Sequence, residues 1–339
     1  MNGMLIEMNR IVELKKVLAR KRLDQVLIFD QANIRALTGV DCDAACLTYD
    51  AIYTDFRYTA MIHRTAPWLK VKDIRRLSVK GRRIGYEPSI SHARFMQLEK
   101  LADKKATFID ISDELAALRM VKTEEEICAL RAAERLNVEI WNEASASFKA
   151  GMTEREMAAL IKHLMIDRGD GEAFETIVCV GANAAECHHV PDDTVWNGRE
   201  PILVDMGVKL GGFCSDLTRN IVPKGVRGLY RKVYALVKEA NRAAIAAVKP
   251  GMTAAKLDKV ARDIIKRGGF GKCFGHSLGH GVGYEIHEAP TVSARSKTVL
   301  KPGMIFTIEP GIYLEGNLGV RIEDVVLVTD DGCEVLSVG

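Results

Sequence analysis

The chain has 339 residues, of which 47% are hydrophobic and 27% are charged, and its formal net charge is +3. This composition is typical of a globular protein with room for two domains, and it excludes a disordered chain, which lacks the apolar surface to offset chain entropy. The net charge is too small to indicate a nucleic-acid-binding protein, so the basic clusters at residues 70–76 and 80–83 are interpreted as solvated faces.

The N-terminal segment carries charges throughout and has no continuous apolar run, so neither a signal peptide nor a membrane span is expected. The eight cysteines are scattered, and none belongs to a CxxC pair. Several lie in apolar runs such as TIVCVG at residues 176–181, where a free cysteine behaves as a small hydrophobic residue. The pattern predicts reduced thiols in a cytoplasmic protein.

The first third of the chain alternates helical patterns with short apolar runs, which predicts a small α/β domain over residues 1–118. Its first helix is expected over residues 5–20, where the apolar positions are Leu5, Met8, Ile11, Val12 and Leu18. A short helix is expected over residues 33–37, and strands are expected over residues 25–29, 45–54 and 83–87.

A second domain, over residues 119–339, is predicted to begin with a long helix. Thr123 suits the N-cap position, and Glu126 three residues later completes a capping box. The helix is expected to run to about Phe148 and to pack as ordinary core through one face, formed by Ile127, Leu130, Leu136 and Ile140.

An internal repeat follows this helix. Residues 149–153 read KAGMT and residues 249–253 read KPGMT, and each copy follows one long helical pattern and opens another that ends at glycine. The economical explanation is two similar α-β halves packed around a shared cleft. Strands are expected after each copy, over residues 174–180, 201–205, 213–222, 305–309 and 320–328.

Four acidic residues lie within or at the end of these apolar strand patterns, namely Asp205, Asp216, Glu309 and Glu323. Burying one unpaired carboxylate costs several kcal/mol, and burying four together adds mutual repulsion. Some of them must therefore be protonated, or a positive charge must compensate. Two divalent cations would balance four carboxylates.

The histidines indicate the same chemistry, because five of the eight fall in two short segments. His188 and His189 lie in ECHHVP, and His276, His280 and His287 lie in GHSLGHGVGYEIHEAP. Imidazole beside several oxygen ligands suits zinc, cobalt, manganese or iron, and the excess of carboxylates favours manganese or cobalt.

This arrangement resembles the pita-bread metallopeptidases, a family that includes methionine aminopeptidase, aminopeptidase P and Xaa-Pro dipeptidase (prolidase). Their ligand order Asp, Asp, His, Glu, Glu matches Asp205 in VDMG, Asp216 in SDLTR, His280 in GHGVG, Glu309 in TIEPGIY and Glu323 in GVRIED. The resemblance covers about residues 120–339. The preceding unit is similar to a creatinase/prolidase N-terminal domain, with GVD at residues 39–41 and TDFRY at residues 54–58, which favours the proline-directed branch.

The resemblance implies an α+β pita-bread domain with an internal pseudo-twofold repeat, two divalent metal ions (Mn, Co or Zn) and hydrolysis of the Xaa-Pro bond by a metal-bridging hydroxide. Asp205 would bind one ion, His280 and Glu309 the other, and Asp216 and Glu323 would bridge them. The resemblance also implies a homodimer that acts on short proline-containing peptides, with no nucleic-acid or membrane partner.

Further roles carry over from the family. Glu309 resembles the proton shuttle, and His188 and His287 resemble the two histidines that contact substrate; alignment on the following Val-Pro-Asp-Asp favours His188 over His189. Arg321, His189 and His276 are expected beside the ligands or the substrate.

The chain departs from the family pattern at Cys187, where proline often precedes the paired histidines, and at Thr291, where a basic residue often follows the HE-x-P segment. Two alternatives to an Xaa-Pro peptidase stay open, namely an aminopeptidase of other specificity and a binding protein that keeps the fold without activity.

Overall fold

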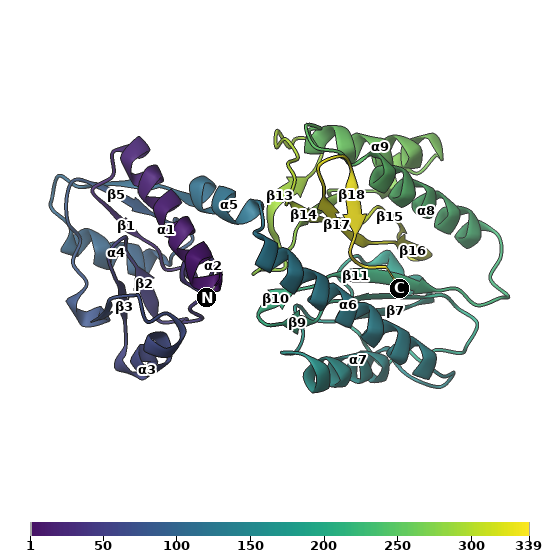
Figure 1. Ribbon diagram of the computed structural model, residues 1–339. Coiled ribbons are helices and arrows are strands. Elements are labelled where there is room, and N and C mark those ends of the chain that lie inside the picture. The colour runs from purple at the N-terminus through teal and green to yellow at the C-terminus, as the bar shows by residue number, and fades with distance from the viewer. Residues whose placement is uncertain (1, 339) are drawn as a thin grey trace. The chain divides into compact units, whose positions relative to one another are not determined.

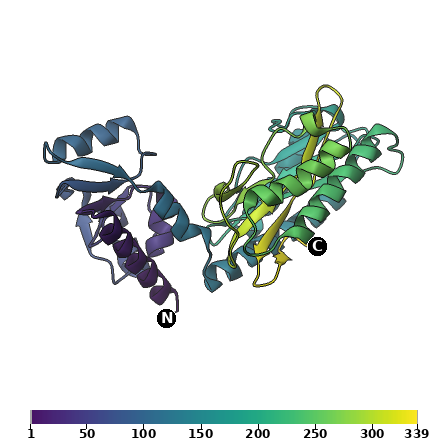
Figure 2. The same cartoon turned by 90° about the horizontal axis from the view of Figure 1, so that it is seen from above.

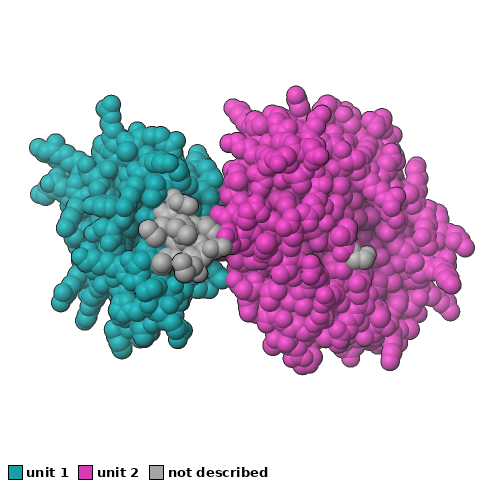
Figure 3. Space-filling view, in the orientation of Figure 1, with its two compact units in different colours: residues 1–119 teal, residues 120–339 magenta. Residues whose placement is uncertain are grey.

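A computed structural model describes residues 2–338, with side chains from residue 10 onward. The chain divides into two compact units, residues 1–119 and 120–339, which Figure 3 colours separately. The predicted apolar positions Leu5 and Met8 lie outside the described side chains. No helix in the described part of the chain is long and apolar enough to cross a membrane.

The first unit contains two small three-stranded sheets and five helices among its described residues (Figure 1). One sheet has the strand order β1-β5-β6 and is parallel, and the other has the order β2-β3-β4. The elements are α1 (Asn2–Lys21), β1 (Gln25–Leu27), α2 (Gln31–Thr38), β2 (Ala45–Leu47), β3 (Ile52–Thr54), α3 (Phe56–Thr65), β4 (Val71–Asp73), β5 (Arg83–Tyr86), α4 (His92–Leu101), β6 (Thr107–Asp110) and α5 (Ser112–Met120).

Two expectations for this unit are wrong in detail. Residues 45–54 form the hairpin β2–β3 rather than one strand, because Thr48 and Ala51 close a turn in which the Thr48 amide donates to the Ala51 carbonyl (2.9 Å). Val12 is 48% exposed, whereas Leu14 and Leu18 of the same helix are buried. The buried stripe of α1 is therefore rotated from the predicted one.

The second unit places two helix pairs beside strands from two halves of the sequence (Figures 1 and 2). Helices α6 and α7 contact strands of the first half, and α8 and α9 contact strands of the second half. The helices are α6 (Glu124–Ser147), α7 (Glu154–Arg168), α8 (Leu229–Ala247) and α9 (Ala254–Arg267). The strands are β7 (Ile177–Val180), β8 (Ile202–Met206), β9 (Lys209–Leu210), β10 (Phe213–Cys214), β11 (Leu217–Ile221), β12 (Gly279–Gly281), β13 (Glu288–Val292), β14 (Ile305–Ile308), β15 (Gly311–Leu314), β16 (Leu318–Arg321), β17 (Asp324–Val328) and β18 (Cys333–Val335).

The predicted repeat is present as one local structure built twice. The Gly151 amide donates to the Trp196 carbonyl (2.8 Å), and the Gly251 amide donates to the Leu300 carbonyl (2.9 Å). Both glycines have positive φ, 99° and 83°, a region that side chains with Cβ disfavour. Thr153 and Thr253 then cap α7 and α9 in the same way. The KxGMT segment therefore encodes a left-handed turn followed by a helix N-cap.

Helix α6 begins as predicted, with a capping box between Thr123 and Glu126. Its buried face includes Ile127 and Leu130, but Leu136 is only partly buried. Besides Glu126 of the capping box, two polar residues farther along the helix, Glu134 and Asn137, lie on the buried face. Since polar groups on a core-facing stripe need partners, this helix does more than fill the core.

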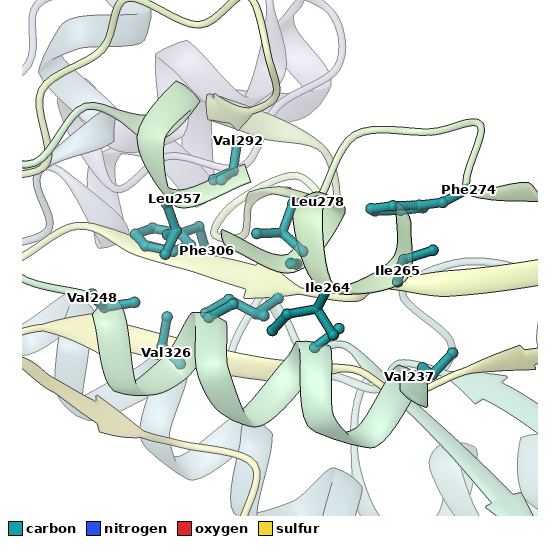
Figure 4. Packing of buried hydrophobic residues seen from close by; sticks show 14 of the residues in the cluster. Val237, Val248, Leu257, Ile264, Ile265, Phe274, Leu278, Val292, Phe306 and Val326 are labelled. Carbon is teal, nitrogen blue, oxygen red and sulfur yellow. The ribbon is translucent and has the colours of Figure 1, made fainter. Parts of the chain in front are cut away.

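The largest hydrophobic cluster joins α8 and α9 to the strands of the second half, as Figure 4 shows for Val237, Leu257, Phe306 and Val326. Burying each large aliphatic or aromatic side chain contributes roughly 1.5–3 kcal/mol. A separate cluster joins α6 and α7 to β7, β8 and β11. Each half thus has its own hydrophobic cluster, which packs its helices against its own strands.

Two strands predicted to be continuous are interrupted, and both interruptions fall at a predicted metal ligand. Residues 213–222 divide into β10, which pairs with β9, and β11, which pairs with β8, with Asp216 between them. The predicted strand 320–328 divides between β16, which pairs with β15, and β17, which pairs with β14, with Glu323 between them. The β12–β13 register also shifts between His280 and Gly281. Such irregularities re-aim side chains that a regular pleat would alternate between faces.

Candidate metal centre

All five predicted metal ligands line one cavity of about 640 Å³ in the second unit. The four histidines predicted near the site, His188, His189, His276 and His287, line the same cavity. Its remaining walls include apolar side chains from three segments, Phe174 and Ile177, Val190 and Pro191, and Ile286. The cavity therefore combines a polar, acidic cluster with apolar wall residues, as small-molecule sites commonly do.

Three of the predicted ligands form a tight cluster. Asp216, His280 and Glu323 each offer a ligand atom, and these atoms all lie within 4.8 Å of one another. They come from the β10–β11 interruption, from β12 and from the β16–β17 interruption. Asp216 and Glu323 are almost completely buried.

The His280 ring presents a lone pair to two carboxylates. Its Nδ1 lies 3.2 Å from the Gly281 carbonyl, which can only accept, so Nδ1 carries the hydrogen. Its Nε2 lies 3.3 Å from Glu309 Oε1 and 3.6 Å from Asp216 Oδ2. Burial lowers the pKa of His280 to about 4, so the ring is neutral at physiological pH. A lone pair facing carboxylate oxygens needs a proton or a cation between them, and a metal ion would supply the cation.

Burial shifts the pKa values of the carboxylates, as expected for charged groups removed from water. Burial and the neighbouring carboxylates raise the pKa of Asp216 and of Glu323 well above the usual range. Burial raises the pKa of Glu309 to about 8, although Arg321 opposes this rise. The buried Oδ1 of Asp205 has no hydrogen-bond partner among the described residues. Oxygen-rich ligands with one neutral imidazole fit divalent cations such as manganese, cobalt or zinc.

The contribution of Glu309 to the stability of the metal-free protein should fall as the pH rises from 4.5 to about 8. The native state holds a proton on Glu309 that the unfolded chain, with its ordinary pKa of 4.5, releases, so this group favours folding only at low pH. Urea denaturation with a chelator, at pH 5 to 8, should show a steeper fall for the wild type than for Glu309→Gln. Equal slopes would contradict the burial of an acidic Glu309.

Arg321 holds the acidic cluster together from one side. The guanidinium group is 4% exposed and donates from Nη2 to Asp205 Oδ2. Its Nε donates to Thr218 Oγ1 (3.0 Å), and Thr218 in turn donates to Glu323 Oε2 (2.6 Å). One arginine thus orients two of the ligand carboxylates, one directly and one through a threonine.

Tyr313 and His276 extend this network. Arg321 Nη1 donates to the Tyr313 hydroxyl (2.9 Å), and that hydroxyl lies 3.0 Å from His276 Nε2. His276 Nδ1 lies 2.8 Å from the Ser277 carbonyl, which fixes Nδ1 as the donor and Nε2 as the acceptor. Burial lowers the pKa of His276 to about 4. His276 therefore serves as a neutral hydrogen-bond acceptor in the wall of the cavity.

The other three histidines differ in accessibility. The His287 ring packs edge-on against the His280 ring, with centroids 4.3 Å apart, and is exposed to the cavity. His188 is also exposed, whereas His189 is buried and its Nε2 lies 2.7 Å from Glu154 Oε2. Of the adjacent pair, His188 is the residue that a substrate could reach.

Sequence reasoning missed Glu134, which supports a ligand from α6. The interruption between β10 and β11 leaves the Asp216 amide outside the strand ladder, and this amide donates to Glu134 Oε1 (3.1 Å). Burial raises the pKa of Glu134 well above the usual range. A glutamate on the apolar stripe of α6, seven residues after Ile127, was the signal that could have identified it.

Comparisons with known proteins agree with this geometry. The model of the creatinase/prolidase N-terminal domain matches residues 10–121, and the model of metallopeptidase family M24 matches residues 128–330. The chain is 35% identical to an Xaa-Pro dipeptidase of Pyrococcus furiosus over 339 residues, which cover 97% of each protein.

Solved structures give the same result. The prolidase from Pyrococcus furiosus has a TM-score of 0.90 at 34% identity, covering 96% of this chain and 99% of that chain. The X-Pro aminopeptidase from Thermotoga maritima has a TM-score of 0.84 at 32% identity, covering 95% and 97%. The predicted pita-bread fold with its creatinase-type N-terminal domain is confirmed. The chain therefore belongs to metallopeptidase family M24.

Proposed function

We propose that this metallopeptidase hydrolyses the Xaa-Pro bond of short peptides, with two divalent ions held by Asp205, Asp216, His280, Glu309 and Glu323. The observation that carries the proposal is the neutral His280 ring facing buried carboxylates from three separate segments. The 35% identity to an Xaa-Pro dipeptidase supports the choice of substrate. We also propose manganese, cobalt or zinc as the metal, a homodimeric assembly and a cytoplasmic location.

In this proposal Asp216 and Glu323 would hold both ions, Asp205 would bind one of them, and His280 with Glu309 would bind the other. When bound, two divalent ions polarise the scissile carbonyl and lower the pKa of water toward about 7. Glu309 moves the proton, since its Oε1 is oriented by Thr307 Oγ1 at 3.1 Å and lies in the cavity.

His188 and His287 contact the substrate from the cavity wall in the same proposal. Both rings are exposed to the cavity and lie in separate segments, so they can donate to a substrate carbonyl from two directions. The apolar wall residues suit the proline ring, which has no amide hydrogen to satisfy.

One feature of the cavity favours a second candidate, an aminopeptidase that removes a residue preceding proline in longer peptides. Among the described residues that line the cavity, Arg321 is the only lysine or arginine, and its Nε, Nη1 and Nη2 all donate to protein groups. Thr291 lines the cavity without a charge, and the exposed Glu175 adds a negative one. The free carboxylate of a dipeptide therefore meets no uncommitted guanidinium or ammonium group in this cavity.

Kinetics on two matched substrates should separate the candidates. Ala-Pro and Ala-Pro-Ala would be compared after loading with manganese or cobalt, with Ala-Ala-Ala as the control for proline. A dipeptidase should have the higher kcat/KM on Ala-Pro, and an aminopeptidase on Ala-Pro-Ala. Equal turnover of Ala-Ala-Ala would favour an aminopeptidase of other specificity, and no turnover with metal bound would contradict the proposed function.

A further inference from the structure

Glu154, the first residue of α7, has a side chain that is fully buried although it belongs to no predicted ligand set. A capping role at the start of α7 is already filled by Glu156, whose Oε2 accepts from the Thr153 amide (2.8 Å). Glu156 is exposed, whereas burying the Glu154 carboxylate costs several kcal/mol unless its oxygens are well satisfied. The partners of Glu154 therefore indicate what this residue is for.

Four groups distant in sequence meet the Glu154 carboxylate. Oε1 accepts from the Val180 amide (2.6 Å) and from Asn183 Nδ2 (2.9 Å). Oε2 accepts from the Asp192 amide (3.1 Å) and lies 2.7 Å from His189 Nε2. Each oxygen thus has two partners, which leaves no orphaned acceptor.

These partners flank the segment that forms one wall of the cavity. Val180 ends β7, Asn183 lies in the following short 3-10 turn, and His189 and Asp192 belong to the irregular segment after it. The wall residues contributed by this segment are Cys187, His188, His189, Val190 and Pro191. No helix or strand holds residues 186–192, so their position depends on contacts such as these and on backbone hydrogen bonds, including that from the Arg155 amide to the Asp192 carbonyl (3.2 Å).

The contact between His189 and Glu154 strengthens the attachment of this segment to α7. Burial opposes a charge on the ring, yet the hydrogen bond to Glu154 and the charge of Glu154 raise the pKa of His189. The pair therefore has the character of a charge-assisted hydrogen bond, which is stronger and more directional than a neutral one.

A second metal site is the alternative explanation, because Glu154, His189 and Asp192 could together surround an ion. The geometry disfavours it. Both Glu154 oxygens already accept two hydrogen bonds, and Asp192 Oδ1 accepts from the Thr194 amide (2.7 Å). A metal would have to displace these donors. Each displaced donor would then be buried without a partner or would need a new one.

We infer that Glu154 is a positioning residue, which fixes the 186–192 segment through His189 and the Asp192 amide, and the end of β7 through the Val180 amide, so that His188 is presented to the substrate. This inference rests on the proposed function, because it assigns His188 a role in substrate binding. Burying an ionic group often stabilises a protein less than an apolar replacement would, so its benefit here is the defined position of the segment.

Kinetics of Glu154→Gln test the inference, with Glu156→Gln as a matched control on the same helical turn. Glutamine keeps the shape but turns one acceptor into a donor that faces existing donors. Glu154→Gln should lower kcat about 10- to 100-fold, as expected for a small displacement of a group at the reacting centre, with KM and metal content nearly unchanged. Glu156→Gln should leave kcat unchanged.

A double-variant cycle with His188→Ala separates positioning from a general loss of structure. If Glu154 acts through His188, Glu154→Gln should lower kcat little further in the His188→Ala background. Independent, multiplying effects would overturn the inference. Where Glu154→Gln fails to fold, His189→Leu removes one donor, leaves the carboxylate in place, and should show the same non-additivity.

Chemical modification of His188 gives a readout that needs no turnover. Acylation by diethylpyrocarbonate, located by peptide mass spectrometry, should change in rate at His188 in Glu154→Gln and not in Glu156→Gln. An unchanged rate would overturn the inference even in an inactive protein. An inactive wild type with bound metal would instead contradict the proposed function, so the two failures are distinguishable.

Discussion

A Glu323→Gln variant should lose bound metal and lower kcat/KM by more than about 100-fold, since replacing groups that merely orient ligands already costs 10- to 100-fold. Glu323 is the carboxylate proposed to bridge both ions, and its Oε2 is held by Thr218. Glutamine can still accept that hydrogen bond, so the change removes the charge without removing the shape. Elemental analysis of the purified variant and titration calorimetry would measure the metal loss.

The same variant should be more stable than the wild type when both are metal-free. Burial and the neighbouring carboxylates raise the pKa of Glu323, so an uncharged group in its place relieves an unfavourable burial. Metal should raise the melting temperature of the wild type and not that of Glu323→Gln. Glu315→Gln, in the exposed turn of the same hairpin, is the control and should change neither property. Full metal retention in Glu323→Gln would refute the bridging role.

Replacing Lys122 with methionine should lower the free energy of unfolding by about 3–5 kcal/mol, the cost of leaving one member of a buried ion pair without the other. Lys122 and Glu288 form such a pair, and both side chains are only 1% exposed. Glu288 follows His287 directly, so the pair also anchors a segment of the cavity wall. Urea denaturation of the metal-free protein, followed by circular dichroism, would measure the change.

Two control variants test whether the loss of stability comes from the buried ion pair. Lys162→Met breaks an ion pair with Glu172 in which the lysine is 57% exposed, and it should cost less than about 1 kcal/mol. The double variant Lys122→Met/Glu288→Gln should recover much of the loss, because no charge is then left buried. A loss for Lys122→Met as small as that for Lys162→Met would show that the pair does not contribute through burial.

That Asp205, Asp216, His280, Glu309 and Glu323 line one cavity agrees with the sequence analysis, which singled them out because buried acidic residues need compensation and because their order matches a known ligand order. The repeated KxGMT turn was also readable, since a glycine with positive φ followed by an N-cap threonine leaves a local trace in the sequence. Both signals lie within a few residues, where sequence reasoning is strongest.

The strand interruptions at Asp216 and Glu323 could not be read in this way. Apolar residues continue on both sides of each carboxylate, so the pattern predicts one strand where the structure has two with different partners. Glu154 was equally hidden, because it looks like a surface residue of a capping motif while its partners lie 26 to 38 positions away. Long-range partners of a single carboxylate leave no local pattern.

The distribution of the ligands over the two halves has a consequence for how the protein matures. Asp205 and Asp216 come from the first half, and His280, Glu309 and Glu323 come from the second. Bringing Asp205 close to Glu323 closes a long loop of the chain, and this closure costs conformational entropy. Contacts between residues so distant in sequence are therefore expected to form late in folding. A nascent chain that has emerged only through β11 therefore has an incomplete set of ligands. In the proposed metal site, ion binding would therefore be a late event of folding, and it would favour chains in which both halves have already docked.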